Sequence, residues 1–221
     1  MNPTPNFDGL ARIYRWMELA SFGPALWRCR CHFLGELQSC RKALVLGDGD
    51  GRFTARLLQV NPEIRVDAVD ASEAMLRALM GRAGRHRERV RTFCADVRTW
   101  EPAGQDYDLI VSHFFLDCLT TEEVARLARR LRSCILPGAK WLTSDFAVPE
   151  NRFGKIVARP MVRGLYFAFR GLTGLRVRRL PDYDNALHNE GFSRKSRYDL
   201  LGGLLVTELW FAEPTELLHS C

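Results

Sequence analysis

The stretch LVLGDGDGR, residues Leu44–Arg52, decides the fold. A short apolar run leads straight into three glycines at alternate positions, and a helical pattern over residues 52–59 follows. Glycine permits the tight turn that joins a buried strand to a helix, and it lets a ligand approach the backbone closely. The stretch therefore predicts a ligand-binding loop at the first strand of an α/β sheet.

Apolar runs and helical patterns alternate beyond this loop. Further strands are expected at 64–69, 90–94, 109–111 and 141–146, and helices at 73–83 and 121–134. The second of these helices opens with Thr120-Thr121-Glu122-Glu123, a capping-box pattern. Such alternation builds a parallel sheet with helices on both faces. Residues 192–200 and 204–211, joined through Gly202-Gly203, predict a closing hairpin and hence an antiparallel strand at or near the edge.

The remaining segments are expected to be helical. Residues 8–20 and 24–39 have apolar positions at helical spacing, and residues 152–175 predict an apolar helical insertion. A chain of 221 residues suffices for one generous α/β domain. We expect an N-terminal helical cap over residues 1–40, one ligand-binding domain over 41–213 and a tail over 214–221.

Composition argues against several classes of protein. No apolar run approaches the ~20 residues that span a bilayer, and the first residues carry no secretion signal, which predicts a cytoplasmic protein without a membrane span. Seven cysteines, an odd number without zinc-ligand spacing, predict reduced thiols and no bound metal. The net charge of +6 comes with local arginine clusters, but no aromatic residues interleave with the cluster over 82–91, so nucleic acid is not an expected partner. The sequence does not indicate which oligomeric state the protein adopts.

Acidic residues follow the first three predicted strands. Asp48 and Asp50 lie inside the glycine loop, where they would repel a pyrophosphate and suit a cationic ligand. The loop also has GxGxG spacing, whereas dinucleotide sites favour GxGxxG. Asp70 ends the second strand and can accept both hydroxyls of a ribose, and Asp96 follows the third, where it can accept an adenine amino group. Open α/β sheets bind ligands at this carboxyl edge.

Over roughly residues 40–213 the chain resembles the class I S-adenosylmethionine-dependent methyltransferases. The loop, AVDASEAML (68–76), YDLIVSHFFLDCL (107–119) and PGAKWLTSDF (137–146) carry the resemblance. It implies a Rossmann-like seven-stranded sheet of order 3-2-1-4-5-7-6 with strand seven antiparallel, and S-adenosylmethionine as cofactor. The resemblance implies that Gly47, Gly49 and Gly51 hold the methionyl part, Asp70 the ribose, and Asp96 with the Val97 amide the adenine. Asp48, Ala71 and Ser112 are further expected cofactor-binding residues. Val45 stands where the family usually has an acid, and Asp48 is the candidate to replace it.

Methyl transfer chiefly requires alignment of acceptor and methyl group, and a base is needed only where the acceptor loses a proton. His113, at the end of the fourth strand, is a candidate base or a residue that lines the cofactor site. Asp117 either pairs with His113 or caps a helix, and Asp145, at the end of the fifth strand, is a further candidate base. The polar-Pro-Pro-aromatic motif of enzymes that methylate amino groups of bases or glutamine is missing here.

The expected acceptor is a small, lipophilic molecule. Residues 179–192 and 200–203 are faintly similar to the C-methyltransferases of ubiquinone and menaquinone biosynthesis. Two alternatives remain open. One is an RNA methyltransferase, which the arginine clusters favour, and the other is a regulatory partner that binds the cofactor without catalysis.

Overall fold

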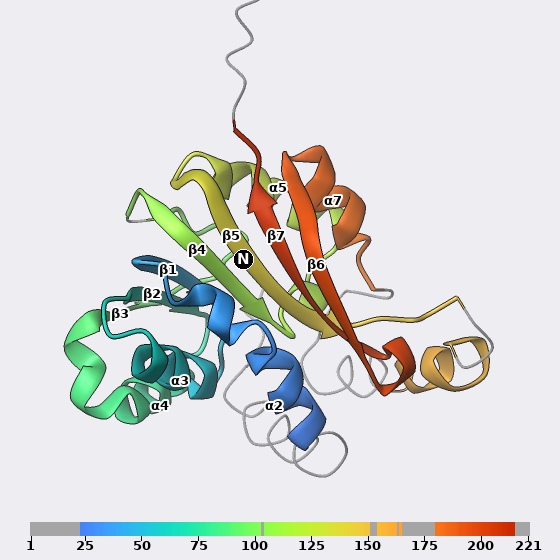
Figure 1. Ribbon diagram of the computed structural model, residues 1–221, viewed down its shortest axis with the longest axis horizontal. Coiled ribbons are helices and arrows are strands. Elements are labelled where there is room, and N and C mark those ends of the chain that lie inside the picture. Colours follow the sequence, from blue (N-terminus) through green and yellow to red (C-terminus); the bar gives the residue numbers. More distant parts are fainter. Residues whose placement is uncertain (1–22, 103, 151–153, 163, 165–179, 215–221) are drawn as a thin grey trace, which may run out of the picture.

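The computed structural model describes residues 23–102, 104–150, 154–162, 164 and 180–214 (Figure 1). Its centre is one seven-stranded sheet of order β3-β2-β1-β4-β5-β7-β6. The strands are β1 (Lys42–Leu46), β2 (Arg65–Asp70), β3 (Val90–Cys94), β4 (Tyr107–His113), β5 (Ile135–Phe146), β6 (Phe192–Leu200) and β7 (Leu205–Ala212). β7 is antiparallel to both of its neighbours, and the other pairs are parallel. The predicted order and the antiparallel seventh strand are confirmed.

Helices cover both faces of the sheet, as predicted. Among the described residues, the α-helices around the sheet are α2 (Gly23–Cys31), α3 (Arg52–Val60), α4 (Glu73–Ala83), α5 (Thr121–Arg132) and α7 (Tyr183–Asn189). Figure 1 shows α3 and α4 on one side of the sheet and α5 and α7 on the other, while α2 lies beside β5, β6 and β7. The predicted capping box starts α5: the Thr120 hydroxyl accepts from the Glu123 amide at 3.2 Å, and the Glu123 carboxylate accepts from the Thr120 amide at 2.8 Å.

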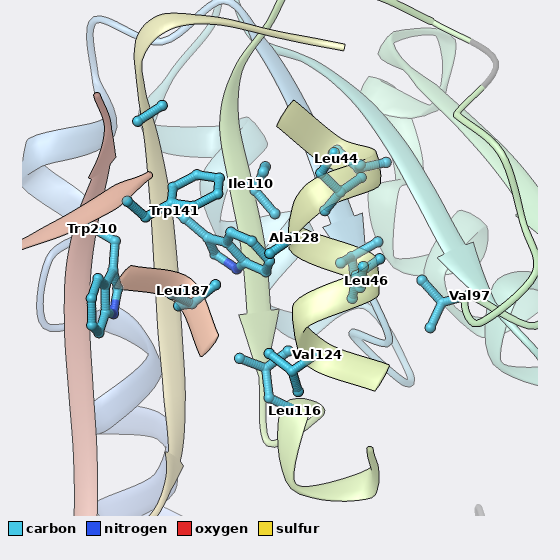
Figure 2. Close-up of a cluster of buried hydrophobic side chains, with 14 of the residues drawn as sticks. Leu44, Leu46, Val97, Ile110, Leu116, Val124, Ala128, Trp141, Leu187 and Trp210 are labelled. Carbon is cyan, nitrogen blue, oxygen red and sulfur yellow. The ribbon is translucent and has the colours of Figure 1, made fainter. Parts of the chain in front are cut away.

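Two apolar clusters lie on the two faces of the sheet. One gathers around Trp141 and packs α5 and α7 against β1, β4, β5 and β7 (Figure 2). The other includes Phe53 of α3 and Leu79 of α4 and packs against the opposite face. The central strands β1 and β4 are therefore buried on both sides, which explains why the sequence shows continuous apolar runs there instead of alternation.

The N-terminal helix is shorter than predicted. The α-helix ends at Cys31, and a 3₁₀-helix (η2, Leu34–Leu37) follows, so the prediction of one helix over 24–39 is wrong. His32 stacks on Tyr198 of β6 with ring centroids 3.6 Å apart, and this contact with the sheet coincides with the break. A packing contact of this kind is invisible to helical spacing.

Other predictions meet the structure in part. The hairpin of β6 and β7 is confirmed, with a 3₁₀ turn (η6, Leu201–Gly203) between its strands. Helix α7 was not predicted. The predicted helix over 8–20 lies outside the described residues, as does most of the insertion over 152–175, whose described part opens with a π-helical turn, Gly154–Ala158. The division into cap, domain and tail stays a prediction.

Candidate active site

The glycine loop joins β1 to α3 in a conformation that requires glycine. Gly47, Gly49 and Gly51 have φ angles of 62°, 59° and 78°, which residues with a Cβ adopt only at an energetic cost. A Cβ on Gly47 would lie 2.2 Å from the ring of Phe115, and one on Gly51 would lie 2.6 Å from the Cα of Leu79. A Cβ on Gly49 would meet no atom within 4 Å. The outer glycines thus allow close packing, and the middle one faces open space.

Asp48 belongs to the loop, and the residue is buried, with 8% of its surface exposed. Its Oδ2 accepts from the amide of Thr54 at 2.9 Å and so stabilises the first turn of α3. Its Oδ1 has no hydrogen-bond partner within the described part of the chain. Burial raises the pKa of this carboxyl, while the charge of Arg30 and the bonds from Thr54 lower it.

Asp50 is engaged elsewhere. Its carboxylate accepts from Arg82 at 2.7 Å and from Arg52 at 3.2 Å. These cations neutralise it, so the expectation that both loop aspartates favour a cationic ligand is not supported for Asp50. Only the charge of Asp48 supports that argument.

Asp70 ends β2, where the predicted ribose site lies. Its Oδ1 accepts from the amide of Ser72 at 2.8 Å, a turn that also leads into α4. Burial raises the pKa of Asp70 to about 6, and the negative charge of Asp48 adds to the effect. The amides of Ser72 and Gly49 oppose it. Exposed Ala71 lies beside Asp70, and its carbonyl accepts a weak bond from the Cys94 thiol at 3.8 Å.

The predicted adenine site contains a partner that sequence reasoning missed. Asp96 is held by Arg98, with an Nη2–Oδ2 distance of 2.6 Å, and this bond lowers the pKa of the carboxyl. An adenine amino group would therefore have to share this carboxylate with the guanidinium. The side chain of Val97 is buried in the cluster around Trp141, so its amide is the group left for a ligand. Both assignments stay predictions.

Ser112 and His113 end β4 and point to opposite faces of the sheet. The Ser112 hydroxyl accepts from the indole N–H of Trp141 at 2.9 Å, which places it in the core on the α5 side. A direct role of that hydroxyl at the cofactor therefore gains no support. The ring of His113 lies against Phe53 of α3, with centroids 4.4 Å apart, on the same side as the start of that helix.

His113 is buried at 3% exposure, and its Nδ1 lies 2.8 Å from the hydroxyl of Ser144 on β5. Its Nε2 is also buried and has no partner among the described residues. Burial, together with the charge of Arg30, holds the pKa of His113 well below its ordinary value. His113 is therefore neutral at physiological pH. The partner that the structure gives it is Ser144, and not Asp117 as one interpretation of the sequence had it.

Asp117 and Asp145 form a pair of carboxyl groups where β4 and β5 end. Asp117 is half-buried in a 3₁₀ turn (η4, Leu116–Cys118), and the Cys118 thiol donates to its Oδ1 at 3.4 Å. Asp145 is 1% exposed, and neither of its oxygens makes a hydrogen bond of normal geometry within the described residues. Burial raises the pKa of Asp117 to about 6. Burial and the charge of Asp117 raise that of Asp145 well above its ordinary value.

The structure therefore brings most predicted residues to one edge of the sheet. Asp48 lies in the loop itself, and Asp70 and His113 end the two strands that flank β1. The ring of Phe115, two residues before Asp117, covers Gly47, which brings the carboxyl pair close to the loop. Sequence reasoning missed Arg30, since nothing in its local pattern indicates that a cationic residue of α2 is buried against Phe114, the residue after His113. Among the described residues, no group of three or more His, Cys, Asp or Glu side chains is arranged to hold a metal ion.

The chain has relatives of known class. Residues 43–138 match the model of a methyltransferase domain. N-terminal Xaa-Pro-Lys N-methyltransferase 1 of Danio rerio is 35% identical over 126 residues, which make up 54% of this chain and 55% of that protein. Malonyl-[acyl-carrier protein] O-methyltransferase of Paenibacillus sp. (strain JDR-2) is 33% identical over 96 residues, 41% of this chain and 35% of that protein. The chain spans about half the length, or less, of these relatives.

Solved structures agree in fold. The S-adenosylmethionine-dependent methyltransferase SibL superposes with a TM-score of 0.68 at 20% identity, over 97% of this chain and 64% of that one. The sheet order and this likeness define the class I methyltransferase fold. Over the matched domain and in its fold, the chain is therefore similar to the class I S-adenosylmethionine-dependent methyltransferases. S-adenosylmethionine is the cofactor that this similarity implies. In the described part of the chain, no helix has the length and apolar character needed to cross a membrane.

Proposed function

We propose that this chain transfers the methyl group of S-adenosylmethionine to a small, apolar acceptor whose reacting oxygen or nitrogen carries a proton. The observation that supports this proposal most strongly is the pair Asp117 and Asp145 at the carboxyl ends of β4 and β5, beside the glycine loop. Ligands of open α/β sheets bind at this edge, so an acceptor here would lie next to the cofactor.

The proposed reaction is an in-line displacement. A lone pair of the acceptor attacks the methyl carbon, and the sulfonium leaves as the neutral thioether of S-adenosylhomocysteine. The acceptor then has one proton too many, and a neighbouring base takes it. Asp117, with a pKa of about 6, is largely ionised at neutral pH and can accept that proton. Asp145, whose pKa is raised well above its ordinary value, holds a proton itself. Because the two groups interact, they titrate as a pair.

Aromatic side chains near the pair support an apolar acceptor. Phe115 precedes Asp117 by two residues, and Phe146 follows Asp145 directly. Phe146 contacts the ring of Phe114 edge-on, with centroids 5.4 Å apart. A flat, apolar molecule would replace water against such rings at a gain of about 25 cal/mol for each Å² it buries.

A second candidate acceptor is the amino group of a protein N-terminus. The identity of 35% to the N-terminal Xaa-Pro-Lys N-methyltransferase of Danio rerio favours it. The carboxyl pair is compatible with an amine as well, because Asp117 could take the proton of an ammonium group. The two candidates therefore differ in the size of the acceptor and not in the chemistry of the site.

The proposal is tested by measuring the formation of S-adenosylhomocysteine with separate panels of acceptors. One panel holds small phenols, hydroquinones and amines, a second holds peptides that begin Xaa-Pro-Lys, and a third holds RNA. Turnover with the first panel supports the proposal, and turnover with peptides or RNA alone contradicts it. Cofactor binding without turnover in any panel favours the silent regulatory partner.

A matched pair of variants tests the role of the carboxyl pair. Asp117→Asn removes the base and should lower kcat by about 10²- to 10⁴-fold. Asp106→Asn is the control, because Asp106 is exposed at the opposite end of β4 and has a φ of 63°, which asparagine tolerates. Equal activity of the two variants would exclude Asp117 as the base.

A further inference from the structure

We propose that Asp48, His113 and Arg30 together hold the amino-acid end of S-adenosylmethionine. In this arrangement the ammonium group donates to Oδ1 of Asp48 and Nε2 of His113, and the carboxylate accepts from the guanidinium of Arg30. The inference rests on the proposed use of the cofactor. It assigns Arg30 of α2 to the site, and it assigns His113 to cofactor binding and not to proton transfer.

A chain of hydrogen bonds fixes the position of the proton on His113. The hydroxyl of Thr207 donates to the carbonyl of Thr143 at 2.9 Å. Since that hydroxyl has only one proton, it accepts from the hydroxyl of Ser144, also at 2.9 Å. The Ser144 proton is then used as well, so Ser144 accepts from Nδ1–H of His113 at 2.8 Å. Neutral His113 therefore presents a bare lone pair at Nε2.

Two buried acceptors without partners thus lie near the loop. Nε2 of His113 is one, and Oδ1 of Asp48 is the other; neither has a hydrogen bond within the described part of the chain. The two side chains are linked through α3, because Asp48 accepts from the amide of Thr54, and the preceding residue, Phe53, packs on the His113 ring. Buried acceptors are normally satisfied, so this pair indicates a ligand that brings N–H donors.

Arg30 provides the opposite charge at the same place. It is 6% exposed, and its guanidinium carbon lies 5.3 Å from the ring centroid of Phe114, the residue after His113. Its charge lowers the pKa of both Asp48 and His113, the effect expected of a cation on this side of the sheet. A guanidinium has five N–H donors, so it can bind a carboxylate in addition to its contacts within the protein.

This arrangement matches a zwitterion. The methionyl part of the cofactor carries one ammonium and one carboxylate close together, and the site offers two acceptors and one cation. Asp50 plays no part, because Arg82 and Arg52 neutralise it. The structure therefore separates the roles of two aspartates that look equivalent in the loop sequence.

The test compares two ligands by calorimetry on the whole chain. S-adenosylhomocysteine has the amino-acid end, whereas 5′-methylthioadenosine retains the adenosine and thioether but lacks it. Asp48→Asn and Arg30→Gln should each weaken binding of S-adenosylhomocysteine by about 10- to 100-fold, the effect of one charge-assisted bond. Binding of 5′-methylthioadenosine should stay within about twofold of wild type in both variants, because it makes none of these bonds. Asp50→Asn is the matched control, and it should leave both affinities within about twofold for the same reason.

Thr207→Val tests the tautomer without touching the ligand. Without the Thr207 hydroxyl, the Ser144 hydroxyl is free to donate to Nδ1 of His113, which moves the imidazole proton to Nε2. An Nε2–H group cannot accept a hydrogen bond from the ammonium group of the cofactor. The ¹⁵N signals of His113 should then exchange their protonated and unprotonated positions, and only S-adenosylhomocysteine should bind more weakly.

Equal losses for both ligands in the Asp48 and Arg30 variants, or no loss for either, would overturn the inference. An Nε2–H signal in the wild-type protein would exclude His113 from the arrangement. If the wild-type chain bound neither ligand, the proposed function itself would fail together with the inference.

Discussion

The carboxyl of Asp70 gives a prediction about stability as well as binding. Its pKa is about 6 in the folded chain against an ordinary value of 3.8, chiefly because burial disfavours the ionised form. The folded state therefore binds the proton more tightly than the unfolded state does. The stability that this provides is complete below pH 3.8 and is lost as the pH rises through 6. At 1.36 kcal/mol for each pKa unit, the gap of about 2.2 sets an upper limit of about 3 kcal/mol.

Asp70→Asn removes the ionised group and retains an oxygen that can accept from the Ser72 amide. We expect the variant to be more stable than wild type by about 1–3 kcal/mol at pH 7.5, with the difference vanishing near pH 3.5, where both side chains are neutral. Urea unfolding at a series of pH values measures this free energy. A variant that is less stable at pH 7.5, or one whose gain does not depend on pH, would refute the reasoning.

The same substitution should weaken the binding of S-adenosylhomocysteine. Two charge-assisted bonds to the ribose are together worth about 1.5–3 kcal/mol, or roughly 10- to 150-fold in Kd. A more stable protein that binds its cofactor less tightly would show that the chain holds an ionised carboxylate at the end of β2 for the ligand. Unchanged affinity would show that Asp70 does not contact the ribose.

Three further predictions follow from the loop, the helix cap and the base. Gly51→Ala should destabilise the fold by about 2–5 kcal/mol, because strain at positive φ adds to a clash with Leu79. Gly49→Ala should cost only the strain, about 1–2 kcal/mol. Equal losses of unfolding free energy for the two variants in urea would contradict this prediction. Thr120→Ala should cost about 1 kcal/mol by the same measurement, and no loss would show that the capping box is unimportant. Turnover by wild type should rise as the pH passes about 6 and then level off, because Asp117 must be ionised to accept a proton, and a pH-independent rate would argue against it.

Much of the fold could be predicted because the signals are local. The glycine loop and the apolar runs determine the strands. The sheet order came from family resemblance, and the structure has the same order. The capping residues of α5 also lie within four consecutive positions. Local patterns do not predict the end of a helix that a distant contact determines. The helix break after Cys31 coincides with the stacking of His32 on Tyr198, which is 166 residues away in the sequence.

The candidate site shows the same limit. The ends of strands could be predicted, and they place Asp48, Asp70 and Asp145 at one edge of the sheet. The neutralisation of Asp50 by Arg82 and the engagement of Asp96 with Arg98 depend on side-chain geometry that no spacing rule contains. The assignment of Ser112 to the cofactor stays a prediction; its hydroxyl accepts from the indole of Trp141 on the α5 side of the sheet, a contact that the sequence does not reveal.

The most direct test of the central claim is a calorimetric titration of the wild-type chain with S-adenosylhomocysteine. The loop, Asp70 and the acceptors at Asp48 and His113 predict saturable binding of one molecule per chain with a Kd in the micromolar range, about −8 kcal/mol. Absence of binding up to millimolar concentration would contradict the assignment of this edge of the sheet to the cofactor.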